Sequence, residues 1–380
     1  MFKKSLAAVA VLGAFAANSM AADVTLYGKV DMGLQYSHAE STNFDGEKTE
    51  ADDLQLNSGV GQASRIGLKA TEDLGNGYKV SFVLENGFNV DDGNMKTSNK
   101  LFDREASLKV SSEWGTLMAG RFGAFSTAAT ATDILLSRVE SFDGGHTGAE
   151  PVMIGRQDNA LAYFTPKIAG FQAAAMYSFK SDNSEKTPVT YTIKDEKVVV
   201  GGGEAIGREG HDDANRYAGL AMTYDIGALQ TAIGFEQIIR GVGHEMADQK
   251  LVTFGGNYDF DMFKLYAGAQ YFEGAKEVYG YKCGEKDGIE GYGLHIGAKF
   301  DALAGHFDTG IYYADAEAQE TQGRDGQYFG IAGRYIYSLS ARTNIRTTLA
   351  YNESTWDKNA KKHDQESDKF TAKISLTHNF

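Results

Sequence analysis

The stretch that decides the fold is DVTLYGKVDMGLQYS, residues 23–37. Apolar side chains recur at alternate positions, and polar ones fill most of the positions between them. A period of two is the spacing of side chains on the two faces of a β-strand. The stretch therefore predicts a strand with an apolar face of Val24, Leu26, Val30, Met32, Leu34 and Tyr36, and a polar face of Thr25, Lys29, Asp31, Gln35 and Ser37.

The same alternation continues through the rest of the chain. It recurs in residues 78–84, 171–179, 218–226, 252–260, 263–271, 292–300, 329–337, 345–351 and 370–380. The polar faces carry Lys79, Lys264, Gln270, His295, Lys299, Asp301, Arg334, Arg342, Arg346, Lys369 and Lys373. Because burying charges in a dry core is costly, these faces must meet water.

Two architectures fit such strands. In a soluble β-sandwich the apolar faces form the inside, whereas in an outer-membrane barrel they face lipid and the polar faces line the interior. The segments run for roughly 10 to 14 residues, while strands of soluble proteins typically have about 5 to 6. Tyr and Phe also recur near both ends of the apolar faces, as in interfacial aromatic girdles. Both features favour the barrel.

The links between strands alternate in length. Short links lie at 74–77, 113–115, 166–170, 226–228, 260–262, 301–305 and 338–341, and longer polar links lie at 38–61, 89–101, 123–155, 180–214, 241–249, 275–289, 317–325 and 357–367. Seven tight turns and eight long loops separate 16 strands. We predict an all-β fold, a 16-stranded antiparallel transmembrane β-barrel with short periplasmic turns and long extracellular loops. The presence of only 3 Pro fits continuous strand pairing.

The composition excludes several functions. The 380 residues contain one cysteine, Cys283, so neither an intramolecular disulfide nor a cysteine-ligated zinc site is available. The formal charge of -14 argues against a nucleic-acid partner. No Gly-x-Ser-x-Gly motif occurs, and His244-Glu245 is followed by Asp248 where a zinc protease needs a second His. We expect no cofactor, no metal and no enzyme activity, with an outer-membrane lipase as the catalytic alternative.

The first 21 residues have the pattern of a secretory signal peptide. Lys3 and Lys4 precede an apolar run from Leu6 to Ala17, and Ser19-Met20-Ala21 resembles a small-residue cleavage site. We therefore expect a signal peptide at 1–21 and the barrel at 22–380. Removal of Lys3 and Lys4 changes the formal charge from -14 to -16.

Sixteen strands set the size of the interior. Barrels of about 8 strands fill with side chains, whereas those of about 16 to 18 leave an aqueous channel. The strand count thus predicts a water-filled channel for ions and small hydrophilic solutes.

Specific residues resemble the Gram-negative general porin family, especially its neisserial and β-proteobacterial type. The similar stretches are Ala22 to Lys29, Ser64 to Lys69 followed by Thr71 to Gly77, Gly120 to Gly123, Arg156 to Asn159 with Tyr163 and Pro166, and the terminal Phe380. Together they span nearly the whole chain after residue 21. The resemblance implies a homotrimer in the outer membrane of a Gram-negative bacterium.

The resemblance also implies a constriction of the channel. In this family the third long loop, here 123–155, folds into the pore and carries acidic residues opposite a basic wall. The matching wall residues are Lys29, Arg65, Arg121 and Arg156, and the matching loop acids are Glu140 and Asp143. Arg104 is a secondary candidate because its parity places it with Ala106 and Leu108 on the lipid face unless the strand is bulged. Ser141 replaces the proline usual in this loop motif.

The expected partners follow from the same resemblance. Phe380 matches the signal that the barrel assembly machinery recognises, and the outer surface would contact outer-membrane lipid and lipopolysaccharide. The acid clusters at 47–53, 91–92 and 195–196 are expected to be solvated loop faces, with divalent-cation sites that bridge lipopolysaccharide as the alternative.

We expect a passive diffusion porin. The alternatives are a solute-selective porin and an adhesin or surface antigen built on a barrel. The net negative charge favours cations at the channel mouths, but the basic polar faces favour anions at the narrowest point, where local charge counts most because salt screens distant charges over about 8 to 10 Å. The prediction is therefore an anion preference.

Overall fold

The computed structural model describes residues 24–127, 130, 132–141, 151–181, 190–194, 197–201, 209–242, 246–283, 287–319, 324–357 and 363–380. The expected signal peptide at 1–21 and the loop acid Asp143 lie outside these residues. None of the described helices is both long and apolar enough to cross a membrane.

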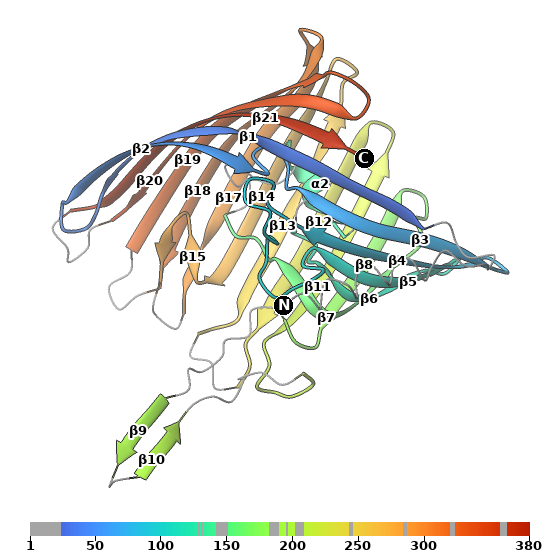
Figure 1. Ribbon diagram of the computed structural model, residues 1–380, viewed down its shortest axis with the longest axis horizontal. Coiled ribbons are helices and arrows are strands. Elements are labelled where there is room, and N and C mark those ends of the chain that lie inside the picture. The colour runs from blue at the N-terminus through green and yellow to red at the C-terminus, as the bar shows by residue number, and fades with distance from the viewer. Residues whose placement is uncertain are drawn as a thin grey trace.

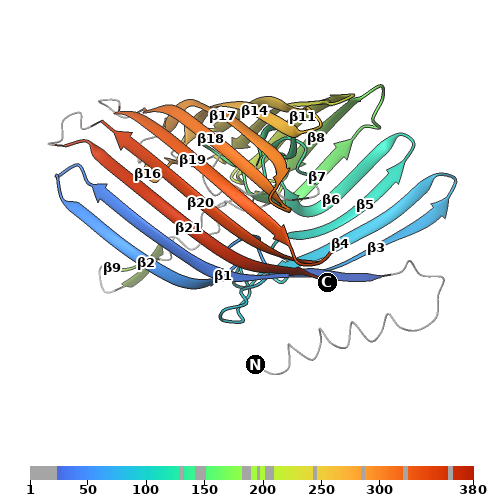
Figure 2. The ribbon, with the colours of Figure 1, turned by 90° about the horizontal axis from the view of Figure 1, so that it is seen from above.

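The chain forms a closed antiparallel barrel (Figures 1 and 2). Its strands are β1 (Thr25–Thr42), β2 (Lys48–Ser58), β3 (Arg65–Gly75), β4 (Tyr78–Gly87), β5 (Glu105–Ser112), β6 (Gly115–Gly123), β7 (Arg156–Phe164), β8 (Phe171–Ser178), β11 (Arg216–Ile226), β12 (Leu229–Ile239), β13 (Gln249–Asp259), β14 (Phe263–Ala275), β17 (Ile289–Ala302), β18 (Gly305–Ala318), β19 (Arg324–Ser338), β20 (Thr343–Trp356) and β21 (Gln365–Asn379). These 17 strands form one sheet. Because β2 and β3 follow one another along the same edge of β1, they share one position, and the barrel has the predicted 16.

The first and last strands close the ring. β1 pairs with β21 from Lys29 opposite Asn379 to Thr42 opposite Glu366. The backbones of Gly28 and Phe380 exchange two further hydrogen bonds of 3.1 Å. The terminal residue thus completes the seam, so no strand edge is left open there.

The two faces of the strands behave as the alternation predicts. Leu26 is 56% exposed and Leu34 is 47% exposed on the outer face of β1, whereas Asp31 on the inner face is fully buried. The turn between β3 and β4 needs positive φ angles at Gly75, Asn76 and Gly77, which explains its glycines. The seven tight turns lie at the predicted positions.

The link at 38–61 is not the loop that its polar composition suggested. β1 continues to Thr42 and returns as β2, with Ser37 to Thr42 paired on both sides. Backbone hydrogen bonds from β21 sustain the strand whatever the polarity of its side chains.

Short strands also occur within two other predicted loops. They are β9 (Thr190–Lys194) with β10 (Lys197–Gly201), and β15 (Glu277–Val278) with β16 (Tyr281–Lys282). The β9–β10 hairpin extends away from the barrel in Figure 1.

The wall differs in height around the ring. Strands β3 to β8 have 8 to 11 residues, whereas β13 to β21 around the barrel have 11 to 15. The longer strands extend the wall on the side of the long loops. One side of the barrel is therefore lower than the other.

The third loop folds inward, as predicted. Its helix α2 (Leu136–Val139) lies within the ring of strands in Figure 1 and packs against β12, β13 and β14. Leu135, Leu136 and Val139 are all at most 2% exposed. The loop thus occupies part of the lumen.

A buried ion pair joins two strands of the inner wall. Arg334 Nε on β19 donates to Asp308 Oδ2 on β18 at 2.8 Å, and both side chains are 2% exposed. Lys299 and Arg334 lie opposite Asp308 on its two neighbouring strands. His306 Nε2 lies 3.1 Å from the other carboxylate oxygen.

We expect Arg334→Met to lower the free energy of unfolding by about 3 kcal/mol, because it removes the guanidinium from a buried carboxylate. The double variant Asp308→Leu/Arg334→Met should lose less, since it leaves no buried charge behind. Urea midpoints of the folded protein in detergent measure both. Equal losses in the single and double variants would contradict the buried-charge explanation.

Candidate functional site

Two predicted wall residues lie side by side on the inner face. Lys29 on β1 is directly opposite Arg65 on β3, and Arg65 is opposite Gly87 on β4. The missing side chain at Gly87 leaves room for the aliphatic part of Arg104, whose Cδ would be 3.3 Å from a Cβ placed there. The register thus brings three of the basic candidates to one part of the wall.

Glu85 is the carboxylate that Arg65 and Arg104 share. Arg104 Nε donates to Glu85 Oε1 at 2.7 Å, and Arg65 Nη1 lies 3.9 Å from the same oxygen. The Tyr27 hydroxyl donates to Glu85 Oε2 at 3.0 Å. Charge-assisted bonds of this kind fix the guanidinium orientation as well as the charge.

Arg104 does not follow the parity that placed it on the lipid face. β5 begins at Glu105, so Arg104 precedes the strand and its side chain is not constrained by the alternation there. Its contact with Glu85 brings it into the basic group, with its side chain only 10% exposed. The sequence carried no sign of where β5 begins.

Arg121 is held at an irregular point of β6. The pairing of β6 with β7 shifts register just after Gly120, which has φ of +130°. Bulges of this kind redirect side chains. Arg121 Nη1 donates to Asp158 Oδ1 at 2.6 Å and its Nε to the Asp103 carbonyl at 2.8 Å, while Lys100 Nζ donates to Asp158 Oδ2 at 2.9 Å.

Arg156 completes the group. Its Nε donates to the carbonyl oxygen of Arg104 at 2.9 Å, and it lies within electrostatic range of the guanidinium groups of both Arg104 and Arg121. We call Lys29, Arg65, Arg104, Arg121 and Arg156 the basic cluster. The structure brings together the five basic residues that the family resemblance selected, on β1, β3 and the segments around β5 to β7.

The third loop is anchored elsewhere by an ion pair that the sequence analysis missed. On helix α2, Arg138 Nε and Nη2 donate to the two oxygens of Asp225 on β11 at 3.1 and 2.9 Å. Lys167 Nζ donates to the same carboxylate at 2.7 Å. The carbonyl oxygen of Arg138 also accepts a bond of 2.9 Å from Asn257 Nδ2 on β13.

Between residues 135 and 141, the third loop rests on a track of glycines. A Cβ atom at each of these positions would come within 2.2 to 3.1 Å of the loop, against Leu135, Val139 or Ser141. The glycines are Gly234 on β12, Gly255 on β13, Gly268 on β14 and Gly297 on β17. Sequence analysis missed this track, although the four glycines share the parity of the polar faces.

The described end of the third loop, at Glu140 and Ser141, is held against the wall. Ser141, which replaces the expected proline, donates from Oγ to the Thr309 carbonyl at 2.6 Å, and its backbone N–H donates to His295 Nε2 at 3.3 Å. Glu140 is only 3% exposed. Its carboxylate is therefore packed near β17 and β18, which are joined to β1 through β19, β20 and β21.

A second set of cations follows the inner wall in register. Lys264 on β14 lies opposite Lys299 on β17, and Arg334 on β19 is linked through Thr348 to Lys373 on β21. We call Lys264, Lys299, Arg334 and Lys373 the basic row. Asp308 stands between Lys299 and Arg334. The row and the basic cluster together make the described inner wall rich in positive charge.

We expect Arg138→Gln to loosen the third loop, because the bond to Asp225 fixes α2 against the wall. Open-channel current noise in a planar bilayer should rise at least about twofold, with the barrel still folded. Lys167→Gln is the matched control, since it removes the more exposed partner of the same carboxylate. Equal noise in Arg138→Gln and the unchanged protein would contradict the anchoring role.

Comparisons with known proteins identify the family of this chain. A family model described as Gram-negative porin matches residues 7–357. The chain is 31% identical over 287 residues to an outer membrane porin protein of Bordetella pertussis, covering 69% of this chain and 68% of that protein. It is 29% identical over 358 residues to outer membrane porin protein 32 of Delftia acidovorans, covering 92% and 89%.

A solved structure shows the same fold. The anion-selective porin from Comamonas acidovorans superposes with a TM-score of 0.64 at 23% identity, covering 94% of this chain and all of that one. The family resemblance inferred from the sequence is confirmed by the family match. The protein is thus a water-filled outer-membrane channel for passive diffusion, and it belongs to the Gram-negative porin family.

Proposed function

We propose that this channel passes small anions in preference to cations. The observation that carries the proposal is the pairing register, which assembles the basic cluster and the basic row on the inner wall. Fixed cations around a narrow aqueous path attract anions and repel cations. The aliphatic and aromatic outer faces contribute no charge to that path.

The acidic net charge of the chain does not oppose this proposal. Salt screens charges over about 8 Å at physiological ionic strength, so carboxylates in outer loops act weakly on ions deep in the channel. Several acids on the described inner wall are paired with cations, Glu85 with Arg104, Asp158 with Arg121 and Asp308 with Arg334.

The basic cluster is the proposed constriction wall. Its guanidinium groups are oriented by Glu85 and Asp158, so the same contacts that hold the cluster in place also fix its field. The five cations of the cluster, with Lys100 beside Asp158, outnumber the acids Glu85, Asp158 and the neighbouring Asp103, which leaves an excess of positive charge. Glu140 and Asp143 remain the proposed loop acids, although the burial of Glu140 limits its direct contact with passing ions.

We also propose a homotrimer. β5 and β8 have 8 residues each, fewer than the about 9 to 11 that a strand needs to cross a bilayer. Neighbouring copies on the low side of the wall would shield these strands from lipid. Assembly partners, with Phe380 as the signal to the barrel assembly machinery, and contacts with lipopolysaccharide remain part of this proposal.

Passive diffusion requires no catalytic group, and we propose that the protein has no hydrolytic activity. Detergent-solubilised protein should leave lipid and ester substrates intact. Release of fatty acid above that of a heat-unfolded sample would overturn this part of the proposal.

Replacing Arg65 and Arg121 by Gln should shift the reversal potential in a salt gradient towards the value expected of a cation-selective channel. We expect the anion-to-cation permeability ratio to fall at least roughly twofold, because two fixed charges leave the channel wall. Arg342→Gln, an exposed charge on a turn, is the matched control and should change little. An unchanged reversal potential in the double variant would refute the constriction role.

Insertion of the unmodified protein into a planar bilayer should give conductance steps that close in three equal parts, because each protomer of a trimer carries its own channel. Cross-linking in detergent should give a limit of three chains. Single, indivisible closures together with a monomeric mass would exclude the trimer.

A further inference from the structure

The hairpin of β1 and β2 carries a group of side chains that the channel function does not use. Among the strands that the structure describes, β2 pairs only with β1, so its other edge has no strand beside it. The outer half of this hairpin stands on the extracellular side of the barrel, beyond the membrane-facing Leu34 and Tyr36. Its side chains at 38, 40, 50 and 52 share one face.

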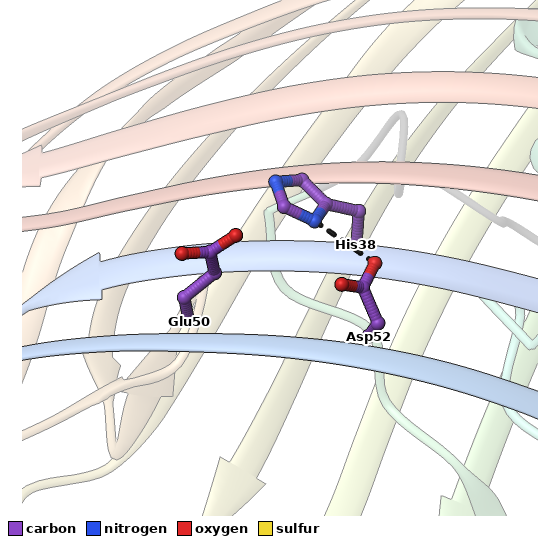
Figure 3. A group of neighbouring side chains, drawn as sticks. All are labelled: His38, Glu50 and Asp52. Atoms are coloured by element: carbon purple, nitrogen blue, oxygen red, sulfur yellow. Dashed lines mark hydrogen bonds and ion pairs between the residues drawn. The ribbon is translucent and has the colours of Figure 1, made fainter.

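Cross-strand register brings a histidine and three carboxylates together. His38 is directly opposite Asp52, and Glu40 is directly opposite Glu50. His38 Nδ1 lies 3.1 Å from Asp52 Oδ1, and His38 Nε2 lies 3.3 Å from Glu40 Oε1. Figure 3 shows His38, Glu50 and Asp52 converging from the two strands, with one donor atom of each within 4.8 Å of the others.

The carboxylates continue in register across neighbouring strands. Glu40 is opposite Asp368 on β21, and Asp368 is opposite Glu353 on β20, so Glu50, Glu40, Asp368 and Glu353 form one row over four strands. Like charges placed directly opposite each other destabilise strand pairing. A bound cation would remove this repulsion.

The surface beside this row is hollowed. A recess of about 300 Å³ is lined by Glu40, Glu50, Glu366 and Asp368 together with polar residues of the hairpin. The Tyr36 hydroxyl donates to Asp52 Oδ1 at 2.6 Å and holds that carboxylate towards His38. Bonds of this type orient ligands in metal sites.

We propose that His38, Glu50 and Asp52 bind a divalent transition-metal ion of the Zn²⁺ class. An imidazole nitrogen with carboxylate oxygens suits such ions, whereas Ca²⁺ and Mg²⁺ favour oxygen ligands alone. Ligands at about 2.0 to 2.2 Å from one Zn²⁺ ion stand roughly 3 to 4 Å apart, so small side-chain rotations would close the observed group around it. The ion would fasten the edge strand β2 to β1.

The test is a calorimetric titration of the full, folded protein in detergent with Zn²⁺ alone. We expect stoichiometric binding that His38→Asn weakens at least about tenfold, since one of three ligands is lost. His306→Asn is the matched control, because His306 also lies between two carboxylates, Asp301 and Asp308, but Arg334 already engages Asp308. Lack of Zn²⁺ binding by the unmodified protein, or equal losses in both variants, would overturn the proposal.

A second measurement separates a ligated ion from loosely attracted cations. Electron paramagnetic resonance of the protein loaded with one equivalent of Cu²⁺ should show nitrogen hyperfine coupling that His38→Asn abolishes. Glu353→Gln removes a charge from the same acid row without removing a proposed ligand, and it should leave both the coupling and the Zn²⁺ affinity within about twofold. An affinity loss in Glu353→Gln as large as in His38→Asn would show diffuse attraction instead of a site. The heat-dependent gel shift of each variant confirms that its barrel is folded.

Discussion

Backbone hydrogen bonding across the seam between β1 and β21 is the interaction on which the rest of this structure depends. Lipid offers no partner to a backbone N–H or C=O group, so a sheet in the membrane must close on itself. Here the seam runs over 14 residues of each strand and ends in the exchange between Gly28 and Phe380. Closure with 16 strand positions leaves a lumen too wide for wall side chains to fill.

A lumen of that width has to be narrowed by something other than the wall, and the third loop does this. Its helix has only four residues, too few to be stable by itself, so tertiary contacts must hold it. The glycine track lets the loop backbone approach the wall, and Arg138 and Ser141 bond it at two separated points, to Asp225 and to Thr309.

The basic cluster illustrates how position and charge are coupled in the channel. Glu85 and Asp158 orient the guanidinium groups, so these carboxylates serve the geometry of the wall while the excess cations shape its potential. The ion pairs that hold the cluster in place and the electric field that its excess cations produce are therefore not alternative roles. The same use of cross-strand register on the outer face, at the β1–β2 hairpin, gathers carboxylates around His38.

Alternation and turn residues are local signals, so the sequence by itself determined the barrel, its strand number and its turns. The inward third loop and the basic residues of the wall followed from the resemblance to the porin family. Tertiary structure decided the contact of Arg104 with Glu85, the burial of Glu140 and the extension of β1 into a hairpin with β2. It also decided the glycine track. Each of these depends on lateral register, which is set by hydrogen bonds between segments remote in sequence, and period-two alternation carries no information about which residue of the next strand lies opposite.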